Sequence, residues 1–162
     1  MSAALHLTEI REGGAQDLSE ISKIMLDAFD PRYGEAWTSA QCLGMLSLPG
    51  VWLIVASLDG TDAGFALARS TGEEAELLLI ATHPKARGRG VGGALLRAVI
   101  AEAEGRGVSR LHLEVRADND AVRLYSTEGF IKVGERRNYY RGKSGQAFDA
   151  HTYARDLAAN II

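Results

Sequence analysis

Apolar and polar residues follow two periodic patterns along this 162-residue chain, one typical of helices and the other typical of strands. Apolar side chains recur at helical spacing over residues 15–29, and Asp30-Pro31 ends that pattern. Thr38 can cap a second, short helix that runs to about Leu48. The first third of the chain is therefore predicted to contribute two helices.

The remaining two thirds alternate between strand and helix patterns. Helices are expected over residues 91–104 and 120–128, where Asp118 can cap the second helix and Gly129 can end it. Strands are expected at residues 5–10, 51–58, 63–69, 73–82, 111–116, 130–136 and 148–157.

The run Leu77-Leu78-Leu79-Ile80 is typical of a central strand that is covered on both faces. The order of elements is strand, two helices, three strands, helix, strand, helix and two strands. This order predicts an α/β sandwich, with helices packed around one mixed sheet. Residues 1–162 are expected to form a single domain, without repeats or linkers.

Composition narrows the functional classes. The net charge of −3 gives no reason to expect binding to nucleic acid phosphates. The single cysteine, Cys42, forms neither an intrachain disulfide nor a cysteine-based zinc site. The first ten residues lack the basic start and the long apolar stretch of a signal peptide. No apolar run approaches the length that spans a bilayer. A cytoplasmic protein is expected, with no partner in the membrane.

A glycine-rich loop, Arg87-Gly88-Arg89-Gly90-Val91-Gly92-Gly93, lies between an expected strand and an expected helix. Glycines let backbone N–H groups approach a ligand, and the helix start adds positive potential, so the loop can hold a pyrophosphate. A tight strand-to-helix turn without a ligand would also explain the glycines. A P-loop needs Lys and then Ser or Thr where Ala94-Leu95 stands. A dinucleotide site is disfavoured because the strand that leads into the loop is itself preceded by three expected strands, whereas such a site follows a first strand.

The loop resembles the acetyl-coenzyme A motif of the GNAT superfamily, Arg/Gln-x-x-Gly-x-Gly/Ala. The resemblance implies that N–H groups from Gly88 to Gly93 hold the pyrophosphate, and that the strand end pairs with the pantetheine arm. The coenzyme-binding residues it implies are Ile80, Ala81, Thr82, Arg87, Gly88, Arg89, Gly90, Val91, Gly92, Gly93, Asn119 and Tyr125.

The second half of the chain is similar to the ribosomal-protein alanine N-acetyltransferases within that superfamily. Residues 113–119, 124–130 and 136–140 carry this resemblance. There are two departures from the family pattern. The spacing from Asn119 to Tyr125 is one residue shorter, which could shift Tyr125, and extra residues 32–36 lie where the peptide site would be shaped.

Acetyl transfer to an amine needs a base for the amine proton and a donor for the leaving thiolate. The resemblance implies Glu114 as the base and Tyr125 as the acid. Glu76 is a rival base, and His112 is a third candidate because imidazole side chains commonly transfer protons near neutral pH. Read from the residues alone, Glu114 can equally be a salt-bridged carboxylate on a strand face, Glu76 a surface charge and Tyr125 a core tyrosine.

Trp37, Glu76, Tyr139 and Tyr140 are expected to line the acceptor site, although surface strand aromatics would also explain the two tyrosines. Asn119 is expected to cap the helix that follows it, to contact the pantetheine, or both. No grouping of His, Asp and Glu has convincing metal spacing, so acetyl-coenzyme A without a metal is expected.

The resemblance implies direct transfer of acetyl to the N-terminal alanine of a ribosomal protein, the eighteenth of the small subunit. Two alternatives remain open: acetylation of a small amine or a protein lysine, and a coenzyme A-binding module that has lost catalysis. The expected partner is therefore a peptide N-terminus or a small amine.

Overall fold

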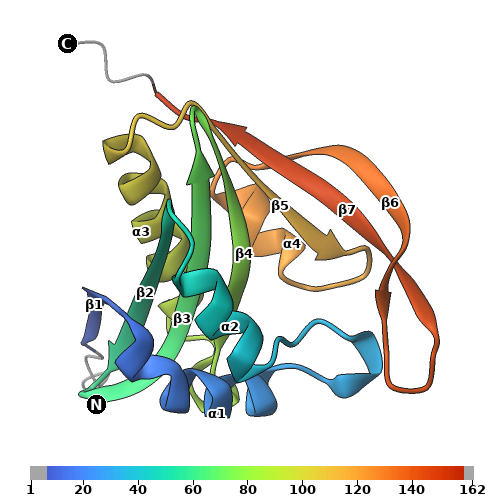
Figure 1. The fold of residues 1–162 in the computed structure, drawn as a ribbon, viewed down its shortest axis with the longest axis horizontal. Helices are drawn as coiled ribbons and strands as arrows, with labels where there is room; N and C mark the ends of the chain where they lie inside the picture. Colours follow the sequence, from blue (N-terminus) through green and yellow to red (C-terminus); the bar gives the residue numbers. More distant parts are fainter. Residues whose placement is uncertain (1–6, 159–162) are drawn as a thin grey trace, which may run out of the picture.

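Seven strands form one mixed sheet in the order β1-β2-β3-β4-β5-β7-β6 in the computed structural model, which describes residues 7–158 (Figure 1). The strands are β1 (Thr8–Glu12), β2 (Val51–Leu58), β3 (Thr61–Thr71), β4 (Glu74–Thr82), β5 (Arg110–Arg116), β6 (Ile131–Arg141) and β7 (Ala147–Asp156). The helices are α1 (Leu18–Ala28), α2 (Ser39–Leu46), α3 (Val91–Gly105) and α4 (Val122–Thr127).

The sheet is mostly antiparallel. Among the described residues, β4 and β5 are the neighbours that run parallel, and helix α3 connects them. The other neighbouring strands pair antiparallel. The predicted α/β sandwich around one mixed sheet is confirmed.

Helices cover both faces of the sheet and bury two hydrophobic clusters. On one face α3 buries Leu95, Leu96 and Val99 against the sheet, together with Tyr125 of α4. On the other face α1 and α2 pack against β2, β3 and β4. Both faces carry completely buried side chains, as expected for a sheet between two helical layers.

A bulge in β4 switches the side chains between these two faces. The β3–β4 register pairs Leu67 with Leu79 and Ala68 with Leu77, so Leu78 is an extra residue. Leu77 accordingly packs in the α3 cluster and Leu79 in the α1–α2 cluster. Such a bulge bends the strand and interrupts its ladder. The expectation that the run 77–80 is covered on both faces is confirmed, because Leu77 and Ile80 pack with the α3 cluster and Leu78 and Leu79 with the α1–α2 cluster. Leu78 and Ile80 are only partly buried.

Most predicted elements are confirmed with shifts of a few residues. Strand β2 has the predicted bounds, and Thr38 caps α2 through its hydroxyl, which accepts a hydrogen bond from the Gln41 N–H at 3.1 Å. Strand β1 begins at Thr8, and Leu5 of the predicted first strand lies outside the described residues. Helix α4 is shorter than predicted and starts at Val122.

The β6–β7 hairpin extends past the rest of the sheet, and the connection between α1 and α2 runs toward it (Figure 1). A β-carbon added to Gly34 of that connection would lie 1.8 Å from the carbonyl oxygen of Arg141 at the end of β6. The two segments therefore pack backbone against backbone. Within residues 7–158, no helix has the length and apolar character needed to cross a bilayer.

Candidate active site

A cleft of about 690 Å³ opens where β4 and β5 part. The two strands pair from Glu74 with Arg110 to Leu77 with Leu113, and their register ends there. Beyond that point the β4 edge over residues 78–82 faces the cleft rather than β5. An open strand edge can bind an extended ligand through main-chain hydrogen bonds. The predicted pairing of Ile80, Ala81 and Thr82 with a pantetheine arm is compatible with this geometry.

The glycine-rich loop closes one end of the cleft. Gly88 and Gly90 have φ angles of +77° and +83°, and no atom lies within 4 Å of a β-carbon added to either residue. The first hydrogen bond of α3 runs from the Ala94 N–H to the Gly90 carbonyl at 3.1 Å. The N–H groups of residues 91–93 therefore precede the helical ladder, at the positive end of a 15-residue helix. This open, donor-rich cradle fits a pyrophosphate.

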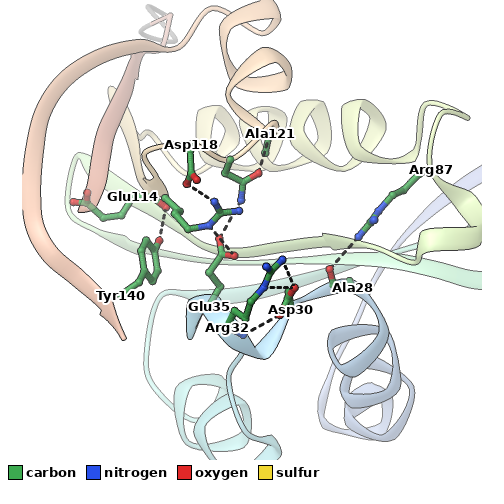
Figure 2. A network of polar contacts seen from close by, with 11 residues as sticks. Ala28, Asp30, Arg32, Glu35, Arg87, Glu114, Asp118, Ala121 and Tyr140 are labelled. Atoms are coloured by element: carbon green, nitrogen blue, oxygen red, sulfur yellow. Dashed lines mark hydrogen bonds and ion pairs between the residues drawn. The ribbon is translucent and has the colours of Figure 1, made fainter. Parts of the chain in front are cut away.

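Arg87 lines the cleft and also makes a contact within the protein. Its guanidinium Nη2 donates to the carbonyl oxygen of Ala28, the last residue of α1, at 3.0 Å (Figure 2). The expectation that Arg87 adds charge for a pyrophosphate stays a prediction. In this structure the side chain ties the glycine-rich loop to the end of α1.

Glu114 lines the cleft, but both of its carboxylate oxygens already have partners. One oxygen lies 3.2 Å from Nε of Arg136, and the other accepts a hydrogen bond from the Thr152 hydroxyl at 2.7 Å. The Glu114 side chain is only 7% exposed, whereas Arg136 is 60% exposed. Glu114 is thus a salt-bridged carboxylate, as one alternative predicted, and it is also within the cleft where a base could act.

Glu76 faces the same cleft from β4. Its side chain is 38% exposed, and its carboxylate lies 3.9 Å from Nε2 of His112 on the neighbouring strand. Glu76 and Glu114 therefore remain rival bases. His112 is the partner of Glu76 rather than an isolated third candidate.

Tyr125 is a core residue that also borders the cleft. Its ring is 5% exposed and packs edge-on against Phe130, with 6.0 Å between ring centroids. Burial, and to a lesser degree the charge of Glu35, raise the pKa of the Tyr125 phenol well above its usual value. The phenol therefore keeps its proton and can act as a donor. The shorter spacing from Asn119 does not remove Tyr125 from the cleft.

The predicted acceptor aromatics also line this cleft. Trp37 lies on the connection between α1 and α2, and Tyr139 and Tyr140 lie at the end of β6. The Tyr140 hydroxyl donates to the backbone carbonyl of Glu114 at 3.1 Å (Figure 2), and burial raises the pKa of this phenol. The 45% exposed Tyr139 packs edge-on against Tyr140, so one ring faces solvent and the other is held.

Sequence reasoning missed Glu35, which lies at the centre of the polar network in Figure 2. Its carboxylate lies 3.4 Å from Nε of Arg116 and accepts a hydrogen bond from Nδ2 of Asn119 at 3.0 Å. Its side chain is 11% exposed. The only signal in the sequence was the set of extra residues 32–36, whose individual side chains carry no motif.

The predicted cap of the fourth helix is wrong. Asp118 pairs with Nη1 of Arg116 instead of capping α4. No side chain caps α4, whose N-cap residue is Ala121. The expectation that Asn119 caps this helix is therefore wrong as well: its Oδ1 accepts a hydrogen bond from the Ala121 N–H at 2.9 Å, in the turn that precedes the helix. Arg116 attracts Asp118 because its guanidinium is only 10% exposed and needs anionic partners.

The structure brings most of the predicted site residues together. Those that line the cleft are Trp37, Glu76, Ile80, Ala81, Thr82, Arg87, Gly92, Glu114, Asn119, Tyr125, Tyr139 and Tyr140. Gly88, Arg89, Gly90 and Gly93 lie beside the cleft in the glycine-rich loop and first turn of α3, and the Val91 side chain is buried in the core.

Comparisons with known proteins agree on a family. The sequence model of the acetyltransferase (GNAT) family matches residues 18–130. The N-alpha-acetyltransferase RimI of Mycobacterium tuberculosis is 37% identical over 147 residues, covering 88% of this chain and 86% of that protein. The [ribosomal protein bS18]-alanine N-acetyltransferase of Escherichia coli K12 is 44% identical over 89 residues, which span 54% of this chain and 60% of that enzyme.

A solved structure extends the similarity to nearly the whole chain. The crystal structure of the ribosomal-protein-S18-alanine N-acetyltransferase from Escherichia coli has a TM-score of 0.83 and 31% identity. The match covers 96% of this chain and 99% of that one. The similarity therefore includes the α1–α2 connection and the β6–β7 hairpin as well as the glycine-rich loop.

Proposed function

Since the chain belongs to the acetyltransferase (GNAT) family and is an acetyl-coenzyme A-dependent N-acetyltransferase, we propose that its acceptor is the N-terminal alanine of a ribosomal protein. The small-subunit protein named for the Escherichia coli relatives, bS18, is the specific acceptor we propose. The observation that carries the proposal is the single cleft at the β4–β5 fork, which joins a pyrophosphate cradle to a pocket lined by Glu76, Glu114 and Tyr125.

The coenzyme is proposed to bind along one half of this cleft. N–H groups at the start of α3 would bind its pyrophosphate, and the open edge of β4 at residues 80–82 would bind its amide-containing arm. This arrangement directs the thioester toward Tyr125 and the end of β5. Acetyl-coenzyme A supplies an activated acetyl group there, and the side chains of the chain supply orientation and proton transfer.

The residues around that point divide the chemistry between them. Glu114 accepts the proton of the acceptor ammonium, directly or through water, so that the neutral amine can attack the acetyl carbonyl. A C–N bond forms and the C–S bond breaks. Tyr125, whose phenol is protonated before the step, donates its proton to the leaving sulfur. The second proton, which the attacking nitrogen loses as it becomes an amide, passes to the Tyr125 phenolate and restores the phenol. Glu76 is the rival base, on the opposite strand of the fork.

The acceptor half of the cleft is proposed to bind an extended N-terminus. Trp37 borders it from the α1–α2 connection, and Tyr139 and Tyr140 border it from β6. Aromatic walls with acidic groups between them suit a peptide that begins with a small residue and a cationic amine. This arrangement supports a peptide acceptor more than a small apolar amine.

Two short peptides test the proposal. One carries the ribosomal sequence with a free N-terminal alanine, and the other has that terminus blocked and its lysines free. We expect acetyl-coenzyme A turnover only with the free alanine. Turnover only with the blocked peptide would identify a lysine acetyltransferase and overturn the proposal. Tight coenzyme binding without turnover of either peptide would point to a small amine.

A further inference from the structure

Glu35 is a buried carboxylate on the segment that borders the acceptor side of the cleft. It lies on the connection between α1 and α2, yet its partners belong to β5 and to the start of α4. A carboxylate with 11% exposure loses most of its hydration, so its contacts must hold it firmly in place. Residues 81 and 84 positions away in the sequence provide these contacts, namely Arg116 and Asn119.

The contact with Asn119 connects Glu35 to the turn that precedes α4. The carboxamide of Asn119 donates from Nδ2 to Glu35 and accepts at Oδ1 from the Ala121 N–H. Because donor and acceptor ends both have partners, the orientation of the amide is set. The carbonyl of Ala121 in turn accepts a hydrogen bond from the Tyr125 N–H at 3.2 Å. A continuous chain of hydrogen bonds therefore runs from Glu35 to the backbone of Tyr125.

The contact with Arg116 joins the same segment to β5. The guanidinium of Arg116 is paired with both Glu35 and Asp118, and its Cζ lies 3.6 Å from the ring centroid of Tyr33. Removing Glu35 would leave Arg116 with Asp118 as a partner. A variant at Glu35 therefore retains a compensated arginine, and we expect it to fold.

We propose that Glu35 is a positioning residue for acetyl transfer, which fixes Tyr125 through Asn119 and the first turn of α4. The inference rests on the proposed function only in taking Tyr125 as the proton donor to the leaving sulfur. Glu35 itself does not touch the reacting atoms. Through Glu35, the position of Tyr125 depends on the connection between α1 and α2, which borders the acceptor side of the cleft.

Two substitutions separate this role from a direct one. Glu35→Ala removes the acceptor for Asn119, and we expect kcat with the alanine peptide to fall at least tenfold, while the Kd for acetyl-coenzyme A stays within twofold. A displacement of about 1 Å at a reacting group is enough for such a loss. Glu35→Gln keeps an oxygen that can accept from Asn119, and we expect it to restore kcat to within threefold of the wild type. Equal losses in both variants would overturn the proposal, because they would assign the effect to charge.

Hydrogen exchange provides a readout that does not depend on the acceptor. In Glu35→Ala the backbone amides of residues 121–127 should exchange faster, while those of α3 should be unchanged. Glu20→Gln is the matched control, because Glu20 is also an ion-paired carboxylate but is exposed on α1, next to Lys23. Unchanged exchange in α4 would overturn the proposal. Unchanged kcat with faster exchange would reduce Glu35 to a structural contact and would overturn it too.

A double-mutant cycle with Asn119→Ala completes the test. If Glu35 acts through Asn119, the double variant should lose no more kcat than the worse single variant, and additive losses would refute the pathway. If the wild type does not acetylate the alanine peptide, the proposed acceptor is wrong. The exchange measurements would still decide whether Glu35 orders α4.

Discussion

Gly90→Ala tests the glycine-rich loop as a pyrophosphate site with a matched control in the same chain. Gly90 has a φ of +83° and Gly145, in the turn between β6 and β7, has a φ of +82°. No atom lies within 4 Å of an added β-carbon at either position. An alanine in this left-handed region costs about 1–2 kcal/mol. The lower entropy of the unfolded chain offsets about 0.4–1 kcal/mol of that cost.

Both variants should therefore lose about 1 kcal/mol of unfolding free energy, which lowers Tm by about 2–4 °C. Their binding of coenzyme should differ. At Gly90 the methyl group would occupy the space in front of the α3 amides, and the loss of one hydrogen bond to a charged group is worth about 1.5–3 kcal/mol. We expect a Kd for acetyl-coenzyme A that is about 10–100-fold weaker in Gly90→Ala and unchanged in Gly145→Ala.

Isothermal titration with acetyl-coenzyme A and urea unfolding of both variants measure these quantities. Equal, wild-type affinity in the two variants would refute the reasoning, since the cradle would then not contact the coenzyme. A large loss of stability in Gly90→Ala alone would refute the assumption that the space is open.

Four further substitutions have expected outcomes. Glu114→Gln should lower kcat by about 10²–10⁴-fold if Glu114 is the base. The same loss in Glu76→Gln instead would assign that role to Glu76. Steady-state kinetics of the two variants distinguishes these outcomes. Tyr125→Phe should lower kcat with little change in Tm, because the ring stays packed against Phe130, and wild-type kcat would exclude it as the donor. Gly34→Ala should lose at least about 3 kcal/mol in urea unfolding, because a left-handed φ of +68° adds to a backbone clash.

The sequence predicted the elements well where a strong local signal marked them. Strand β2 and helix α2 are examples, since a dense apolar run and a capping threonine leave little choice. The bulge at Leu78 was not predictable, because a run of four apolar residues has no period that could mark where the faces switch. The pairing of β4 with β5 ends at Leu77, the residue directly before this bulge.

The candidate site was predicted where its residues are close in the sequence. The glycine-rich loop and the segment from Glu114 to Tyr125 carry local motifs, and both lie in or beside the cleft. Asp118 was a reasonable cap by its position, but Arg116 two residues earlier competes for its carboxylate. The local preference of Asp118 for a capping position was overridden by its ion pair with Arg116. This pair is strong only in the folded protein, because the fold nearly buries the guanidinium.

Glu35 marks the limit of that reasoning. The segment between α1 and α2 is held at several places: Arg87 binds the carbonyl of Ala28 just before it, Arg116 and Asn119 bind Glu35, and the backbone of Gly34 packs against Arg141. Each contact joins it to a different, distant part of the chain. The shape of the acceptor side is therefore a property of the tertiary structure. Transfer of residues 32–36 alone into a relative should not transfer acceptor preference unless these partners accompany them.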